Sequence, residues 1–223
     1  MPFRNAQWLV AVGAEQTTAV FEPAAERGAE AVFVCAHGAG GHRDYRGMVR
    51  LSEVLRAQGL GVVRFNFLYR EKASRRPDTM QRLKECFDAV VSRTRTELSP
   101  HALIIGGRSM GGRVASMLAA DGFACDALLL LAYPLHPADK PEQLRDAHLP
   151  QIKVPVLCFN GTRDALCRRD LMERALSSVR APWEMHWLEA ADHSFHVLKS
   201  SGRTDDQVLA EVGDVSQRWL SQF

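Results

Sequence analysis

The feature that most constrains this chain is the stretch at residues 101–120, HALIIGGRSMGGRVASMLAA. An apolar run ends in two glycines, a serine follows after one arginine, and an apolar pattern at helical spacing comes next. Gly107, Ser109 and Gly111 match G-x-S-x-G between a predicted strand and a predicted helix. Such a sharp turn raises the serine hydroxyl above a sheet, with glycines where a Cβ would collide with neighbouring backbone. A serine before a helix is also a common N-cap, but that alternative leaves the glycines unexplained.

Strands and helices alternate along most of the chain, which predicts an α/β protein with a mostly parallel central sheet and helices on both faces. Two short segments, 8–12 and 17–21, are expected to form an antiparallel hairpin at the sheet edge. The other strands are predicted before Ser109 and at 31–36, 61–65, 127–131, 154–159 and 183–188. Helices are predicted around 48–55, 79–98, 169–179 and 205–223, with a helical patch at 142–148 and a polar loop at 66–77.

The length of the chain fits one domain over residues 1–223, because α/β folds of this size form single units. Only a short loop and one helix fit between the strand that ends at Leu131 and the strand that begins at Val154. We therefore expect no cap domain over the carboxyl ends of the strands.

Composition and spacing argue against several classes of partner. The formal net charge of +2 is too small to favour nucleic acid or an anionic membrane, and no apolar run approaches the ~20 residues of a membrane span. The histidines are scattered and no metal-binding or nucleotide-binding spacing occurs, so we expect no metal and no cofactor. Five cysteines without C-x-x-C spacing, and no secretory signal, predict buried reduced thiols, as at Cys35 and Cys158, in a cytoplasmic protein.

Three polar residues follow predicted strands in the order Ser109, Asp164 and His193. The carboxyl ends of parallel strands meet at one edge of a sheet, so this topology implies that the three side chains converge. A serine hydroxyl needs a base within hydrogen-bond reach, and the base needs an orienting acid. Hydrolases of the α/β type supply these groups in this chain order, which predicts a catalytic triad.

Other assignments of the acid and the base remain open. Asp164 could instead form an Asx turn or a helix cap, which would leave Asp139 or Asp192 as the acid. His196 could act as the base, whereas His186 lies inside an alternating strand and is expected to be structural.

A tetrahedral intermediate would also need hydrogen-bond donors for its oxyanion. One is expected to be the backbone N–H of Met110, and the other that of Ala39 or Gly40 in the loop HGAGG after the strand at 31–36. The substrate is expected to lie in an open cleft, which suits small esters better than long buried lipids. An arginine in this cleft, Arg70 or Arg108, could meet a carboxylate on the substrate, and the alternative is that these arginines are only solvated. The side chains predicted to line the cleft are His37, Tyr69, Arg70, Arg108, Leu135 and His136.

Several stretches together resemble a known family. They are HGAGG at 37–41, GGRSMGGR at 106–113, YPLHP at 133–137, GTRDALC at 161–167 and HWLEAADHSF at 186–195. The set resembles the small α/β-hydrolase-like family typified by a testis-expressed protein, which includes a domain in a subunit of a nuclear histone-acetyltransferase complex. It is more distantly similar to dienelactone-hydrolase-type enzymes.

The resemblance implies the α/β-hydrolase fold from about residue 31 onward, and it implies that Ser109, Asp164 and His193 form the triad. Dienelactone hydrolases use a cysteine nucleophile where this chain has Ser109, so their substrate class does not transfer.

These observations predict a carboxylesterase-like serine hydrolase that acts on small carboxylic esters or related acyl compounds. We expect a monomer or a homodimer with a small-molecule substrate, and no nucleic acid, membrane or cofactor as a partner. A non-catalytic protein-interaction domain is the main alternative, because members of the family that the chain resembles are candidates for such a role. A peptidase on short peptides is a further alternative, since it would use the same residues on a different leaving group.

Overall fold

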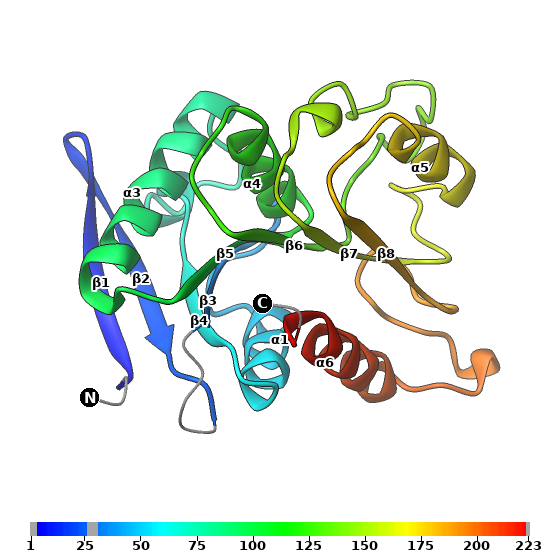
Figure 1. Cartoon of the computed structure of the whole chain (residues 1–223), viewed down its shortest axis with the longest axis horizontal. Helices are drawn as coiled ribbons and strands as arrows, with labels where there is room; N and C mark the ends of the chain where they lie inside the picture. The colour runs from blue at the N-terminus through cyan, green and yellow to red at the C-terminus, as the bar shows by residue number, and fades with distance from the viewer. Residues whose placement is uncertain (1–3, 26–30, 222–223) are drawn as a thin grey trace.

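The apolar runs of the sequence pair into a sheet of eight strands, in the order β1-β2-β4-β3-β5-β6-β7-β8 (Figure 1). The computed structural model describes residues 4–25 and 31–221. The strands are β1 (Ala6–Val12), β2 (Glu15–Glu22), β3 (Ala31–Ala36), β4 (Gly61–Phe65), β5 (Ala102–Arg108), β6 (Ala127–Leu131), β7 (Val156–Gly161) and β8 (Trp183–Leu188). The α-helices are α1 (Arg46–Ala57), α2 (Leu68–Glu71), α3 (Met80–Leu98), α4 (Met110–Ala120), α5 (Arg169–Leu176) and α6 (Asp205–Leu220).

The strands from β4 to β8 in this order run parallel, and β2 and β1 are added antiparallel at one edge. The predicted edge hairpin and the mostly parallel sheet are therefore confirmed. Strands β3, β5, β6 and β7 are buried along almost their whole length. Burial on both faces explains why they appear in the sequence as continuous apolar runs instead of alternating patterns.

Helices cover the sheet from two sides (Figure 1). Helices α3, α4 and α5 pack on one face, where Phe87, Val114 and Met172 join the larger of two buried clusters. Helices α1 and α6 pack on the other face, where Leu51 and Val212 join the second cluster. Each of these helices presents an apolar stripe to the sheet, as the helical spacing of the sequence predicts.

The polar loop predicted at 66–77 is wrong in its first half. This stretch contains the short helix α2 and buries Phe67, Leu68 and Tyr69 almost completely. The ring of Phe67 packs edge-on against Phe65, with 5.2 Å between the ring centroids. The loop after β4 is therefore anchored by aromatic packing, which fixes its path across the carboxyl edge of the sheet.

The helical patch predicted at 142–148 is also wrong. Backbone groups that a helix would use are bonded elsewhere: the N–H of Arg145 donates to the carbonyl of Leu135, and its carbonyl accepts from the hydroxyl of Tyr133. A short 3₁₀ helix, η1 (Leu149–Gln151), follows instead. The segment between β6 and β7 thus lies close to the sheet and builds no separate cap.

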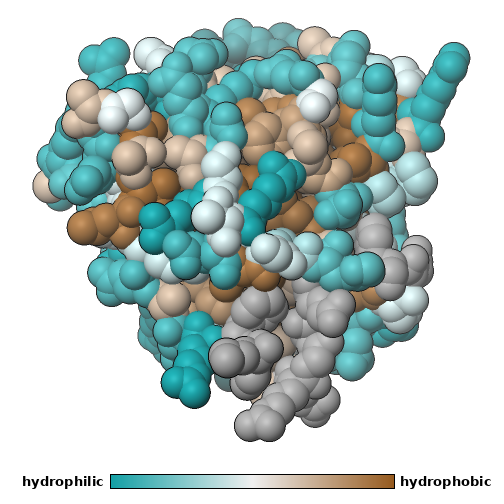
Figure 2. Space-filling model, turned by 60° about the vertical axis from the view of Figure 1, so that its left-hand side comes forward, coloured by the Kyte–Doolittle hydropathy of each residue, from teal (hydrophilic) through white to brown (hydrophobic). Residues whose placement is uncertain are grey.

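The surface is polar over much of its area. Figure 2 brings the β1–β2 side of the molecule forward, and hydrophilic side chains cover much of that face, with hydrophobic residues between them. The exposed large hydrophobic side chains of the described chain are Leu9, Tyr45 and Leu198, which come from three separate segments. Within residues 4–25 and 31–221, no helix has the length and apolar character that a membrane crossing needs.

Gly106 provides a test of how closely the central strands pack. A Cβ built on this residue would lie 1.9 Å from the carbonyl oxygen of Leu129 in β6, which no rotamer change can relieve. We expect Gly106→Ala to destabilise the fold by about 2 kcal/mol or more, as overpacking of a rigid interior does. The measurement is the denaturant midpoint, with Gly40→Ala as the matched control because a Cβ there meets nothing within 4 Å. Equal midpoints for the two variants would contradict this packing.

Candidate active site

Ser109 lies at the sharp turn between β5 and α4, with φ 50° and ψ −114°. This left-handed backbone conformation is strained for a residue with a Cβ, and it persists because the surroundings fix it. The N–H of Ser109 donates to the carbonyl of Leu131, 2.8 Å away. Cβ atoms built on Gly107 and Gly111 would lie 2.2 and 2.5 Å from the carbonyl oxygen of Ala36, so only glycine lets the end of β3 approach this turn.

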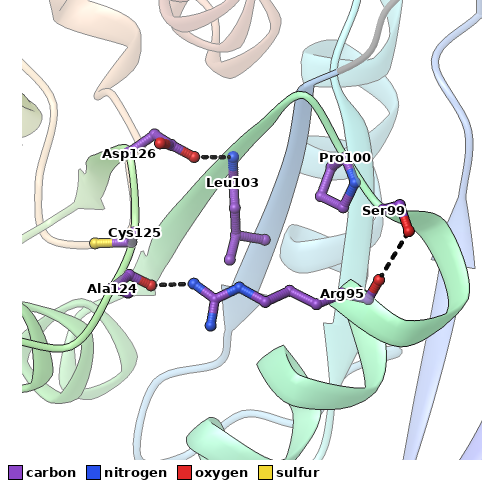
Figure 3. Close-up of a pocket in the computed structure, with 7 residues that line it drawn as sticks. All are labelled: Arg95, Ser99, Pro100, Leu103, Ala124, Cys125 and Asp126. Carbon is purple, nitrogen blue, oxygen red and sulfur yellow. Dashed lines mark hydrogen bonds between the residues drawn. The ribbon is translucent and has the colours of Figure 1, made fainter.

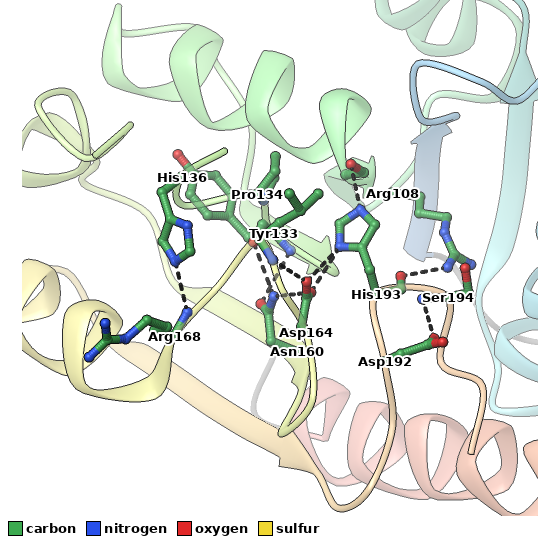
Figure 4. Close-up of polar contacts among 12 residues, drawn as sticks. Arg108, Tyr133, Pro134, His136, Asn160, Asp164, Arg168, Asp192, His193 and Ser194 are labelled. Atoms are coloured by element: carbon green, nitrogen blue, oxygen red, sulfur yellow. Dashed lines mark hydrogen bonds and ion pairs between the residues drawn. The ribbon is translucent and has the colours of Figure 1, made fainter. Parts of the chain in front are cut away.

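The side chains of Ser109, His193 and Asp164 form a continuous hydrogen-bonded chain. The Nε2 atom of His193 lies 2.9 Å from the Oγ of Ser109. Its Nδ1 atom lies 2.9 and 3.0 Å from the two carboxylate oxygens of Asp164 (Figure 4). Asp164 follows β7 and its side chain is fully buried, whereas His193 follows β8 and its side chain is 27% exposed.

This arrangement assigns the protons of the imidazole. An ionised carboxylate can only accept a hydrogen bond, so Nδ1 of His193 carries the proton that faces Asp164. The lone pair of Nε2 then faces Ser109 and can accept the proton of its hydroxyl. The geometry therefore fits a base that is oriented by an acid and directed at a nucleophile.

Asn160, which the sequence reasoning missed, holds the Asp164 carboxylate in place. Its side-chain amide donates to one carboxylate oxygen over 3.0 Å, and the backbone N–H of Leu166 donates to the other over 2.8 Å. Asn160 is itself fixed, because its amide also exchanges hydrogen bonds with the backbone of Tyr133. The one available signal was a polar residue inside an otherwise apolar strand, VLCFNG, where a fully buried amide needs partners.

The residues considered as alternative acid or base, Asp192, Asp139 and His196, have other surroundings. Asp192 accepts hydrogen bonds from the backbone of Ser194 and His196, and so shapes the loop after β8. The ring of His196 faces Asp205, 3.0 Å away, and His186 pairs with Glu211 over 2.7 Å. Asp139 is exposed.

The loop HGAGG lies directly against the serine turn. A Cβ built on Gly38 would be 3.4 Å from the Cβ of Ser109, and the N–H of Gly41 donates back to Gly38 to close a tight turn. Ala39 and Gly40 at the tip of this turn are exposed. Met110 is the first residue of α4, where a backbone N–H has no acceptor within the helix. The N–H groups of Ala39, Gly40 and Met110 as oxyanion donors stay a prediction.

His37 does not line a cleft, which corrects one sequence prediction. Its ring is fully buried: Nδ1 lies 2.7 Å from the carbonyl of Gly38, and Nε2 accepts the N–H of Phe67 over 3.2 Å. Burial lowers the pKa of His37 to about 4, so the ring is neutral. His37 therefore connects the loop HGAGG to the loop after β4 from behind the site.

Three more residues predicted to line the cleft are buried to 99% or more, and for their side chains that prediction is wrong. These residues are Tyr69, Leu135 and His136. The hydroxyl of Tyr69 donates to the carbonyl of Ala39, 2.8 Å away, and His136 accepts the N–H of Arg168. The reason is that apolar packing and backbone hydrogen bonds draw them under the surface, where they support the loops.

The two arginines predicted for the cleft are partly exposed. Arg70 donates to the carbonyl of Ser74 over 3.1 Å, within its own loop. Arg108 donates to the carbonyl of His193 over 2.8 Å, and its guanidinium lies 5.3 Å from the centre of the Phe195 ring (Figure 4 shows the first contact). Arg108 therefore touches the loop that carries the base.

A hollow of about 370 Å³ lies at the amino ends of β5 and β6, and Figure 3 shows its lining residues. Ser109 follows the opposite, carboxyl end of β5. Its arginine, Arg95, donates to the carbonyl of Ala124. Its thiol, Cys125, has a pKa raised to about 12 by burial, and thiols in that state are poor nucleophiles near neutral pH. The predicted buried thiols Cys35 and Cys158 are free and buried, and burial raises the pKa of each.

No three His, Cys, Asp or Glu side chains of the described residues gather as the ligands of a metal ion would. The side chains of Ser109, His193 and Asp164 lie in one hydrogen-bonded chain, on loops and a turn that follow the carboxyl ends of β8, β7 and β5.

A family model described as an alpha/beta hydrolase domain matches residues 29–221. The chain therefore belongs to the α/β hydrolase domain family. The predicted fold class, without a separate cap, is confirmed.

Solved structures of other proteins share this fold. An α/β serine hydrolase homologue from Coxiella burnetii is 20% identical, with a TM-score of 0.79 and 98% of each chain covered. An α/β serine hydrolase without a lid from Xanthomonas campestris is 18% identical, with a TM-score of 0.78 over 98% of this chain and 96% of that one. A dienelactone hydrolase from Anabaena variabilis is 20% identical, with a TM-score of 0.77 over 100% and 98%. The hydrolase family and the dienelactone-hydrolase-like architecture expected from the sequence are thus present.

The buried position of His37 makes a prediction about acid stability. The folded chain holds its pKa near 4, while the unfolded chain returns it to about 6.5, so between these values the unfolded state binds more protons. Stability should therefore fall as the pH is lowered from about 6.5 towards 4. His196 should behave in the opposite direction, because its hydrogen bond to Asp205 raises the pKa of its exposed ring.

Imidazole NMR signals followed through a pH titration check both directions. His37 should stay neutral at pH 5, while the pKa of His196 should be raised above the ordinary value for histidine. A His37 signal that titrates near pH 6.5 would mean that its ring is not buried between the two loops.

Proposed function

We propose that this protein is a serine hydrolase that acts on small carboxylic esters or related acyl compounds. The observation that carries the proposal is the hydrogen-bonded chain from the Oγ of Ser109 through His193 to the buried carboxylate of Asp164. Membership of the α/β hydrolase family and the likeness to serine hydrolase structures support it.

In the proposed reaction, the Oγ of Ser109 attacks the carbonyl carbon of the ester while Nε2 of His193 takes the hydroxyl proton. The backbone N–H groups of Met110 and of Ala39 or Gly40 bind the oxyanion that forms. The bond to the leaving alcohol then breaks, and His193 returns its proton to the alcohol oxygen. Water attacks the acyl-serine by the same route in reverse, which releases the acid and restores the hydroxyl of Ser109.

Asp164 is proposed to hold the ring of His193 and to stabilise it when it becomes positively charged. Its carboxylate lies away from solvent and accepts hydrogen bonds from Asn160 and Leu166, so its direction is fixed before the reaction begins. Fixed dipoles of this kind require little reorganisation during the chemical step.

Small substrates are favoured in this proposal because no separate domain covers the carboxyl edge of the sheet. Within the α/β hydrolases, we also propose kinship with the testis-expressed family on the strength of the GRSMG and PLHP pieces at 107–111 and 134–137. A cytoplasmic location and a monomeric or dimeric state stay predictions from the sequence.

The proposed triad predicts covalent labelling by a fluorophosphonate. The wild type should gain the adduct mass on Ser109, and Ser109→Ala should remain unlabelled while Ser177→Ala, an exposed serine after α5, is labelled normally. Intact-mass spectrometry followed by peptide mapping measures the result. A folded wild type that resists labelling would favour the non-catalytic interaction domain.

Ester turnover gives a second test of the same groups. We expect His193→Ala and Ser109→Ala to lower kcat for a short-chain p-nitrophenyl ester by roughly 10⁴-fold or more, since members of a triad act as a unit. His101→Ala should leave kcat unchanged, because this exposed histidine lies at the amino edge of the sheet. Unaltered turnover in His193→Ala would transfer the role of base to another histidine. Comparison of esters with aminoacyl amides separates an esterase from a peptidase.

Tyr69 is proposed to position the loop HGAGG at 37–41, which we call the oxyanion loop. Burial raises its pKa to about 12, so the phenol keeps its proton and donates to the carbonyl of Ala39. Tyr69→Phe should lower kcat by about 10-fold with little change in KM, because only the alignment of the Ala39 peptide is lost. Tyr133→Phe is the control, since it removes a hydroxyl bonded to Arg145 over 2.7 Å, and it should affect stability without this fall in kcat. Equal kcat values for the two variants would remove Tyr69 from the oxyanion loop.

A further inference from the structure

A hollow of about 290 Å³ opens beside the proposed triad, between the first turns of α1 and α6. Two of its lining residues, Arg108 and Ser194, are the chain neighbours of Ser109 and His193. The hollow therefore adjoins the turn that carries Ser109 and the loop that carries His193. We call it the arginine hollow, and its charged lining side chains are Arg46, Arg50, Arg108, His196 and Asp205.

Arg108 brings to this wall a positive charge that has no ion pair. It donates to the carbonyl of His193 and lies over the ring of Phe195, but it forms no ion pair with a carboxylate of the described residues. Burial lowers the pKa of Arg108, while the more distant charges of Asp192 and Asp164 act in the opposite direction. Guanidinium groups hold their proton in proteins, so the charge persists at neutral pH.

The other charged groups of the hollow leave its balance positive. Arg50 pairs with Asp206 and His196 pairs with Asp205, so these contacts are largely compensated. Arg46 is exposed and makes no ion pair within residues 4–25 and 31–221. Helix α1 has no acidic side chain in its first turn, so nothing there offsets the charge of Arg46. Two of the arginines that line the hollow, Arg46 and Arg108, therefore have no ion pair within the described residues.

We infer that the arginine hollow binds a carboxylate carried by the ester substrate, and that Arg46 and Arg108 determine this specificity. The planar fork of a guanidinium matches a carboxylate with two parallel hydrogen bonds, which a solvated ammonium group does not reproduce. The volume suits the end of a short acyl chain better than a large polyanion. This inference rests on the proposed function, since it names the class of ester that the Ser109 site takes.

The test compares two p-nitrophenyl esters of matched acyl length, the neutral hexanoate and the mono-ester of adipate, which ends in a carboxylate. The wild type should show the higher kcat/KM with the adipate ester. Arg46→Glu should lower kcat/KM for the adipate ester by about 10-fold, because one ion pair is lost and the new glutamate repels the carboxylate. The same variant should change kcat/KM for the hexanoate ester by less than two-fold. A glutamate in the first turn of α1 favours the helix, so the variant keeps its fold.

Arg180→Glu is the matched control, because it makes the same charge change at an exposed residue that precedes β8 at the opposite edge of the sheet. It should leave the ratio of the two kcat/KM values unchanged. Arg108→Lys keeps the charge without the fork, and it should raise KM for the adipate ester more than it changes kcat. Equal rates for the two esters in the wild type, or an equal loss with both esters in Arg46→Glu, would overturn the inference.

A binding measurement separates failure of this inference from failure of the proposed function. Calorimetry with free adipate and Ser109→Ala requires no turnover, and binding that weakens about 10-fold in the double variant Ser109→Ala/Arg46→Glu would support the carboxylate site even in an inert protein. An active esterase that does not bind adipate would retain the proposed function and remove the carboxylate site.

Discussion

The candidate site depends on a close backbone contact, where the end of β3 meets the turn between β5 and α4. The carbonyl of Ala36 lies where the Cβ atoms of residues 107 and 111 would be, so two glycines are required at once. Because the two backbones approach this closely, the loop that follows β3 lies against Ser109. Both the strained serine and the neighbouring exposed amides therefore result from one steric constraint. If these strands moved apart, the hydroxyl and the donors for an oxyanion would separate together.

Behind this contact, buried polar groups hold the loops that carry the candidate site. The neutral ring of His37 bridges two loops, the hydroxyl of Tyr69 holds Ala39, and Asn160 holds Asp164. Each of these groups is almost fully buried and each has its hydrogen-bond partners, so each is a fixed dipole instead of a mobile side chain. Such groups give the site its rigidity, and they do so without touching a substrate themselves.

The charged side chains near Ser109 affect which substrates this edge of the sheet would favour. Asp164 is buried and belongs to His193, so its negative charge is not presented to a ligand. Arg108, the residue before Ser109, donates to the backbone carbonyl of His193 and has no ion pair with a carboxylate of the described residues. A nucleophile bordered by cations selects for substrates that carry a negative charge, which connects the proposed chemistry to the proposed specificity.

The sequence by itself determined the sheet, because short continuous apolar runs between turn residues are typical of strands buried on both faces. It also determined the turn at Ser109, because glycines at 107 and 111 leave few alternatives. The chain order of Ser109, Asp164 and His193 also follows from motif and topology. Tertiary structure alone decided which polar residues face inward: His37, Tyr69 and His136 were expected to line the substrate cleft, yet packing and backbone hydrogen bonds bury them. The hydrogen bonds of Asn160 and the lack of an ion pair at Arg108 likewise depend on residues distant in the chain. Spacing along a sequence carries backbone periodicity, whereas burial and ion pairing depend on contacts between separate elements, which no local pattern records.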